Sequence, residues 1–157
     1  KQLQDWAHEN NMLFIVDEIQ SGMGRTGSMY CYQEEGLEPD ILLLGKALGN
    51  GFHLAAVLVK EQPAIEVLPA LTGGSGEDPV CCAAACEVFR QLENGLLEHI
   101  KNMGRILING LKNFEDFSIV TDVRGRGLAA ALEFVNEDIG KQIYGELISK
   151  GFLAGFV

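Results

Sequence analysis

Short, unbroken apolar runs alternate with glycine-rich and polar segments over the first sixty residues. Runs at 12–16, 40–45 and 54–60 have the length of strands and do not alternate polar with apolar residues. Such runs are typical of strands covered on both faces, as in a parallel sheet with helices above and below it. Residues 18–39 are enough for the crossover that joins two parallel strands. The pattern therefore predicts an α/β arrangement for this part of the chain.

Helical periodicity is seen at the start of the chain and again after residue 78. Residues 1–10 are typical of the end of a helix, with an apolar face formed by Leu3, Trp6 and Ala7. A short helix is predicted around 30–36. Asp78 and Pro79 supply the N-cap and the first-turn proline of a longer helix, which Gly95 ends or bends. The next helix has an apolar face made of Ile100, Met103, Leu107 and Leu111.

The last third of the chain has a different pattern of apolar and polar residues. The stretch FSIVTDVRGRGLAAALEFV predicts two β segments on either side of residues 124–127, and a helix follows over 137–151, closed by Gly151. The final residues KGFLAGFV are typical of a strand, so a small β-β-α-β unit is expected. We predict two parts, residues 1–97 and residues 98–157, the second an α+β unit.

Composition and charge narrow the classes of function. The chain has 47% hydrophobic and 22% charged residues, as in ordinary globular proteins. Its formal net charge of −10 disfavours nucleic acid and anionic membrane partners. Apolar runs are far shorter than the roughly 20 residues that span a bilayer. We expect a cytoplasmic protein that acts on small molecules, and the missing initial Met indicates a piece of a longer chain.

Four cysteines raise the question of disulfides or metal. Cys81, Cys82 and Cys86 lie in an alanine-rich helical stretch, and Cys31 stands apart. The C-x-x-C pairs or nearby histidines of zinc sites are absent from the sequence. We expect small core residues and no metal site.

The chemical centre of the sequence is an acid and a lysine at the ends of two predicted strands. Asp17 ends the first strand, and Lys46 follows the second in LLLGKALGNG. If these strands are neighbours, both side chains face one crevice, where α/β sheets bind ligands. A partly buried lysine can condense with an aldehyde, as in pyridoxal phosphate enzymes, and a carboxylate keeps that cofactor's ring nitrogen protonated. Ile19 then lies against the ring, and Gln20 contacts its hydroxyl oxygen.

Other interpretations of these residues stay open at this point. Asp17 could cap a helix or form a salt bridge, and Lys46 could be a solvated surface residue. The Asp17–Glu18 pair also suits Mg²⁺ in a nucleotide-binding module. That module needs a G-x-x-x-x-G-K-[ST] loop, and GMGRTGS is not one.

Four motifs, in order along the chain, resemble the class III pyridoxal phosphate-dependent aminotransferases, which include the ornithine, acetylornithine and 4-aminobutyrate aminotransferases. They are FIVDEIQSGMGRTG, EPDILLLGKALGNGF, GGSGEDPVCCAAA and DVRGRGL. The resemblance implies a PLP-dependent transferase of fold type I. The chain then holds the later part of its large, mostly parallel-sheet domain and part of its small C-terminal domain. It also implies a homodimer that moves an amino group between an amine or amino acid and a 2-oxo acid.

Site roles follow from the same resemblance, because Asp17 and Lys46 stand 29 residues apart, as their counterparts do in the family. Lys46 is implied to form the Schiff base with pyridoxal phosphate and to carry a proton to and from the substrate. Asp17 is implied to hold the ring nitrogen, Ile19 to pack on the ring and Gln20 to contact the phenolic oxygen. We expect Arg25 to shape the adjacent loop rather than to touch substrate.

The chain departs from the family pattern at two places. The family's phosphate-binding threonine falls where this chain has LTGGSGEDP, so Thr72 and Ser75 are the candidates for a substitute phosphate ligand. In GNGFHL, Asn50 and His53 are candidates for tuning the substrate pocket or for loop and surface roles.

Some features of the enzyme lie outside this sequence. Arg124 and Arg126 invite assignment as a carboxylate clamp, yet the main carboxylate-binding arginine of many relatives lies beyond Val157. The family's phosphate loop and ring-stacking aromatic residue precede Lys1, so the fragment alone is expected to be inactive. Related aminomutases, decarboxylases, racemases and phospho-lyases share the lysine and the aspartate, and a non-catalytic relative is a further alternative.

Overall fold

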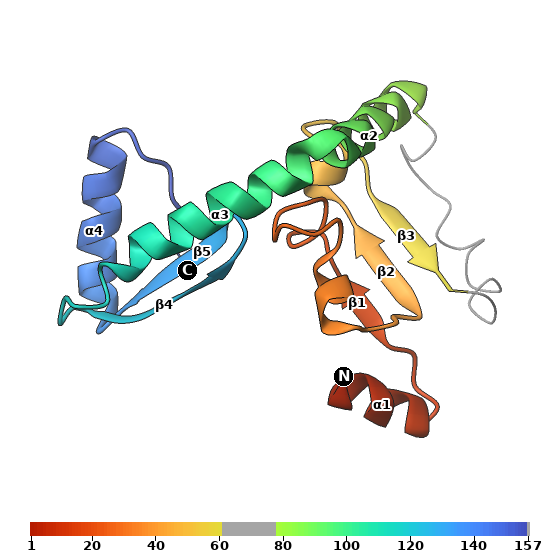
Figure 1. Cartoon of the computed structure of the whole chain (residues 1–157), viewed down its shortest axis with the longest axis horizontal. Helices are drawn as coiled ribbons and strands as arrows, with labels where there is room; N and C mark the ends of the chain where they lie inside the picture. The colour runs from red at the N-terminus through yellow and green to blue at the C-terminus, as the bar shows by residue number, and fades with distance from the viewer. Residues whose placement is uncertain (61–77, 157) are drawn as a thin grey trace.

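The computed structural model describes residues 1–60 and 78–156, which form two groups of elements bridged by a long bent helix (Figure 1). The first group contains α1 (Gln2–Glu9), β1 (Ile15–Asp17), η1 (Cys31–Glu35), β2 (Ile41–Leu44), η2 (Lys46–Leu48) and β3 (Ala56–Val59). The bridge contains α2 (Pro79–Gln91), η6 (Leu92–Leu96) and α3 (Leu97–Lys112). The second group contains β4 (Val120–Arg126), β5 (Ala129–Phe134) and α4 (Glu137–Ser149).

The first sheet has the order β1-β2-β3. Strands β1 and β2 are parallel, as predicted, but β3 runs antiparallel to β2. The expectation of a parallel third strand is wrong because only residues 45–55 join β2 to β3, fewer than a parallel crossover takes. Within this chain the sheet is also not covered on both faces, since Ile15, Val57 and Leu58 are exposed.

The main core lies where the glycine-rich loop after β1, strand β2 and the bridging helix meet. Its buried members are Met23, Leu42, Leu44, Leu48, Ala85, Leu92 and Ile100. The core therefore packs the carboxyl end of β2, where Lys46 follows, against the bend of the bridging helix.

Helix α1 is attached by polar contacts and by only one residue, Ala7, of the predicted apolar face. Leu3 and Trp6 are more than half exposed, whereas Gln4 and Ala7 are buried. The Gln4 Oε1 accepts a hydrogen bond from the Glu38 N–H at 2.7 Å. At its end, His8 Nε2 lies 3.0 Å from Asp40 Oδ2, and the Phe14 N–H, together with His8, holds the pKa of Asp40 below its usual value.

The bridging helix begins and bends at the predicted residues. The Asp78 carboxylate accepts hydrogen bonds from the N–H groups of Val80 and Cys81, and Pro79 occupies the first turn. Gly95, with a φ of 101°, interrupts the helical backbone. This bend lies two residues before the boundary between residues 1–97 and 98–157, and that division stays a prediction.

Two expectations for this helix are only partly met. Cys81 is buried as a small core residue, but Cys82 and Cys86 are exposed because only one face of α2 meets the core. Ile100 is buried on α3, while Met103 and Leu107 on the same predicted face are more than a third exposed.

The second group is an antiparallel β4–β5 hairpin followed by α4. The Asn136 side chain caps α4, and Gly151, with a φ of 82°, follows its end as predicted. The predicted last strand is wrong for residues 152–156, which have no strand structure. These residues are instead packed through a side chain, since the Phe156 ring lies 5.8 Å from the Tyr144 ring of α4.

None of the helices built from residues 1–60 and 78–156 is long and apolar enough to cross a membrane.

Candidate active site

The ends of β1 and β2 bring the two candidate chemical residues to the same edge of the sheet. Asp17 pairs with Leu43 in the parallel register, and the Glu18 N–H donates to the Leu43 carbonyl oxygen at 2.9 Å. Lys46 follows β2 after Gly45. The prediction that these strands are parallel neighbours with adjacent carboxyl ends is confirmed.

Lys46 has an unusual backbone and a specific side-chain partner. Its φ is 44°, in the left-handed region, which costs an ordinary residue about 1–2 kcal/mol. Its Nζ donates a hydrogen bond to Gln20 Oε1 at 2.9 Å. A non-glycine residue held in this region is a recurrent feature of functional sites, because the surrounding structure must hold the strained backbone in place.

Lys46 and Gln20 line an open cavity of ≈ 770 Å³. Ile19 lines the same cavity, and a Cβ added at Gly45 would lie 3.5 Å from Ile19 Cγ2. The opposite wall is made of Arg124 and the alanines 129–131 of β5. The structure thus brings together three of the predicted site residues, Lys46, Ile19 and Gln20.

The remaining predicted site residues are placed differently. Asp17 Oδ1 accepts a hydrogen bond from the Ile19 N–H at 2.8 Å, and Asp17 is not among the described residues that line the Lys46 cavity. Thr72 and Ser75 lie outside the described residues.

Glu18 is buried and structural, with 2% of its surface exposed. Its Oε1 accepts a hydrogen bond from the Tyr32 N–H at 2.7 Å, and its Oε2 accepts one from Ser21 Oγ at 2.6 Å. Both carboxylate oxygens are therefore occupied by the loop, whereas Asp17 bonds elsewhere. The geometry does not form the paired carboxylates of a Mg²⁺ site, and the part of the chain described here contains no cluster of three or more potential metal ligands.

Replacing Glu18 tests this structural role. We expect Glu18→Ala to lower the free energy of unfolding by about 2–4 kcal/mol, because it orphans the Tyr32 N–H and leaves a void. Glu18→Gln should cost much less, since its amide oxygen can serve Tyr32 and its NH₂ group can serve Ser21. Urea titration of both variants in the full-length protein measures the difference. Equal losses in the two variants would contradict this role.

The glycine-rich loop after β1 is packed against the bridging helix. A Cβ at Gly24 would meet the side chains of Leu92 and Ile100, and a Cβ at Gly27 would meet Lys101. The Arg25 carbonyl oxygen accepts a hydrogen bond from the Leu128 N–H at 3.0 Å. The loop beside the cavity is therefore held both by the bridging helix and by the hairpin of the second group.

Two arginines of the hairpin have carboxylate partners within the chain. Arg124 Nη1 lies 2.6 Å from both Asp122 Oδ2 and Glu133 Oε2, and these carboxylates raise the pKa of Arg124. Arg124 nevertheless lines the cavity.

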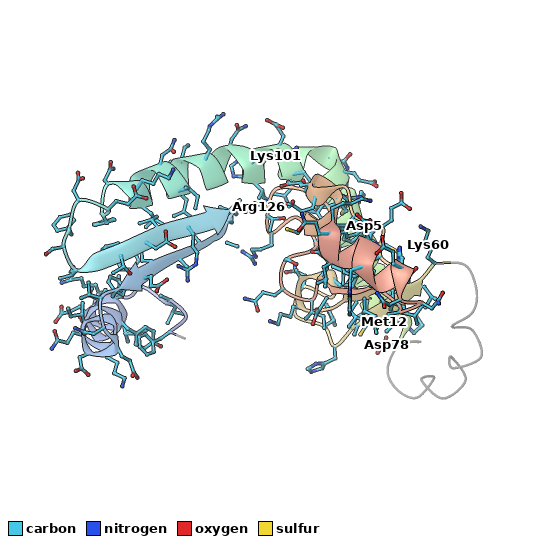
Figure 2. The ribbon with its side chains drawn as sticks, turned by 90° about the horizontal axis from the view of Figure 1, so that it is seen from below. Asp5, Met12, Lys60, Asp78, Lys101 and Arg126 are labelled. Carbon is cyan, nitrogen blue, oxygen red and sulfur yellow. The ribbon has the colours of Figure 1, made fainter. Side chains whose placement is uncertain are left out.

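Arg126 lies at the end of the hairpin that faces the first group of elements (Figure 2). It is not among the described residues that line the Lys46 cavity. Its guanidinium donates to Glu35 Oε1 at 2.7 Å and lies 3.4 Å from Glu34 Oε2, both on η1. The hydrogen bond to Glu35, followed by that to the Cys31 sulfur, raises the pKa of Arg126. Sequence reasoning missed this tie because its partners lie more than ninety residues away.

Sequence reasoning also missed the alanine wall of the cavity. A run of alanines is unusual in a strand, where branched and aromatic residues are preferred, and this run was the available signal for a close approach. Of the two residues suggested for pocket tuning, Asn50 lines the cavity, and His53 is exposed outside it.

This chain is similar in sequence and in structure to known aminotransferases. The family model for "Aminotransferase class-III" matches residues 1–156. An acetylornithine aminotransferase of Oceanobacillus iheyensis is 37% identical over 87% of this chain and 35% of its own length. A solved ornithine aminotransferase from Plasmodium yoelii has a TM-score of 0.87 and 34% identity, over 99% of this chain and 42% of that one.

A third similar protein is the omega transaminase from Pseudomonas jessenii, whose structure was solved in complex with PMP. It has a TM-score of 0.83 and 31% identity, over 97% of this chain and 38% of that one. The chain thus spans about two fifths or less of the length of these relatives.

Proposed function

The chain belongs to the class III aminotransferases, and from this premise we propose that it is part of an enzyme that transfers an amino group from an amine or amino acid to a 2-oxo acid. The resemblance seen in the sequence and the fold of type I PLP-dependent transaminases are confirmed by the family match and the structural neighbours. Because the chain spans only part of its relatives, the activity, substrates and assembly of the whole protein are proposals. The same proposal includes a cytoplasmic homodimer and the division of this chain into residues 1–97 and 98–157.

The described residues suit pyridoxal phosphate. A primary amine, a branched apolar side chain and an amide are grouped in one open cavity, as Lys46, Ile19 and Gln20. The cofactor supplies an aldehyde that bonds to an amine and a ring that accepts electrons from the substrate. We propose that Lys46 Nζ bonds to it, that Ile19 packs against the ring and that Gln20 contacts the phenolic oxygen. Thr72 or Ser75 is the proposed phosphate ligand.

The observation that carries the proposal is the Lys46–Gln20 hydrogen bond of 2.9 Å inside this cavity. Gln20 orients the Lys46 amine toward the space that a substrate would occupy. From there, Lys46 Nζ removes a proton from the substrate α-carbon and returns it. Asp17, at the end of the neighbouring strand, is proposed to hold the proton on the ring nitrogen.

The proposal is tested by borohydride reduction of the full-length, cofactor-loaded protein, followed by peptide mapping. We expect the cofactor mass on the peptide that contains Lys46, because reduction makes a lysine–aldehyde bond permanent. Lys60, which is paired with Glu38 at 2.8 Å, serves as the internal comparison. Cofactor-loaded protein with an unmodified Lys46 would refute the assignment.

A further inference from the structure

The Lys46 cavity has a charge opposite to that of the chain. The formal net charge is −10, yet the charged residues lining this cavity are Lys46, Arg25 and Arg124, all basic. No Asp or Glu is found among the described residues that line it. Such a site favours an anionic ligand, because low-dielectric walls concentrate the field of fixed charges.

The three cations differ in the side-chain partners that the chain gives them. Arg124 is held between Asp122 and Glu133, and Lys46 is bonded to Gln20. The Arg25 side chain makes neither a hydrogen bond nor an ion pair with any residue in 1–60 or 78–156. It is the cation of this cavity that is left for a ligand.

A second cavity bounded by Arg25 does not supply a counter-ion. This smaller cavity, of ≈ 380 Å³, is also lined by Glu87. The Glu87 carboxylate is already bonded to Arg90 at 2.6 and 2.7 Å and to Gln91 at 2.6 Å. The hydrogen bonds from Arg90, followed by that from Gln91, lower the pKa of Glu87 to about 2.

The Arg25 backbone is held in place. Its N–H donates to the Gly22 carbonyl oxygen at 3.3 Å, and its own carbonyl oxygen accepts from Leu128 at 3.0 Å. Gly24, with a φ of 85°, and Gly27, with a φ of 99°, flank it in backbone conformations that glycine adopts readily. Because the backbone of this loop is already ordered, binding through Arg25 restricts only its side chain, and the planar fork of the guanidinium matches a carboxylate.

We propose that Arg25 binds a carboxylate of the substrate while the substrate's amino group lies beside Lys46. This role rests on the proposed function and makes it more specific, because it selects amino acids and oxo acids over uncharged amines. It also revises the expectation that Arg25 only shapes the loop. The cofactor's phosphate is an anion too, so the experiment must separate the two sources of negative charge.

The test compares a donor with its own carboxamide in the full-length holoenzyme. The donor is whichever of ornithine, N-acetylornithine and 4-aminobutyrate has the highest kcat/KM in the wild type. We expect Arg25→Gln to lower kcat/KM for the acid by about 10- to 100-fold and to leave the carboxamide within about 3-fold, as expected for the loss of a charge-assisted hydrogen bond. Arg25→Lys should keep part of the preference. Arg105→Gln, on the exposed side of α3, is the matched control and should change neither substrate.

The other outcomes overturn the proposal in recognisable ways. Equal losses for acid and carboxamide would mean a structural role, and an unchanged kcat/KM for both substrates would mean that Arg25 does not recognise the carboxylate. Weaker binding of pyridoxal phosphate to the Arg25→Gln apoenzyme, with an unchanged ratio, would assign Arg25 to the phosphate. A wild type that accepts only an uncharged amine would overturn the carboxylate role alone, and one that transaminates neither the amine nor these donors would overturn the proposed function itself.

Discussion

Replacing Lys46 with alanine is expected to lower the rate of amino transfer in the full-length enzyme by about 10²- to 10⁴-fold or more. Among the described residues that line the cavity, Lys46 carries the only primary amine. Its removal deletes both the group proposed to bond to the cofactor and the group proposed to move the substrate proton. Single-turnover measurements with saturating cofactor and donor separate this chemical loss from weaker binding.

Two control variants make the result specific. Lys60 lies beyond the opposite end of the β2–β3 ladder (Figure 2), where it is paired with Glu38 on the surface, so Lys60→Ala should leave the rate close to that of the wild type. Lys46→Arg keeps a positive charge but provides no free amine, and we expect it to be as inactive as Lys46→Ala. A Lys46→Ala enzyme with near-normal turnover would show that the chemistry resides elsewhere.

The parts of the site that were predictable from sequence depend on short-range order. An apolar strand that ends at Asp17, and another that is followed by Gly45 and Lys46, place both residues at strand ends once the strands pair in parallel.

The parts that were not predictable depend on contacts between distant segments. The direction of β3 is set by a short connection that its own apolar pattern does not reveal. Leu3 and Trp6 have the spacing of a buried face, yet α1 is held through Gln4 and His8 instead. The Arg126 tie to η1 requires the hairpin to lie against the first group of elements, which no local pattern encodes.

The close contact between α3 and the β4–β5 hairpin leads to a further prediction. Alanine at two glycines of α3 should change the free energy of unfolding in opposite directions. Alanine normally stabilises a helix interior by up to about 1 kcal/mol over glycine. Gly110→Ala should do so, because a Cβ there meets nothing within 4 Å. Gly104→Ala should instead destabilise the full-length protein by about 1–3 kcal/mol, because its Cβ would lie 2.6 Å from the Gly127 Cα. Thermal and urea unfolding of the two variants measure the contrast.

The clash caused by a Cβ at Gly104 is not easily relieved by moving Gly127, because Gly127 is itself packed against the backbone of Thr26. Gly127 has a φ of 57°, and it lies so close to Thr26 that a Cβ at Gly127 would be 2.7 Å from the Thr26 Cα. A shift of Gly127 would also move Leu128, whose N–H is bonded to the Arg25 carbonyl oxygen at the cavity. We therefore expect Gly104→Ala, unlike Gly110→Ala, to lower kcat/KM together with stability. Equal stabilisation by both alanines would mean that α3 and the turn of the hairpin at Gly127 are not in tight backbone contact.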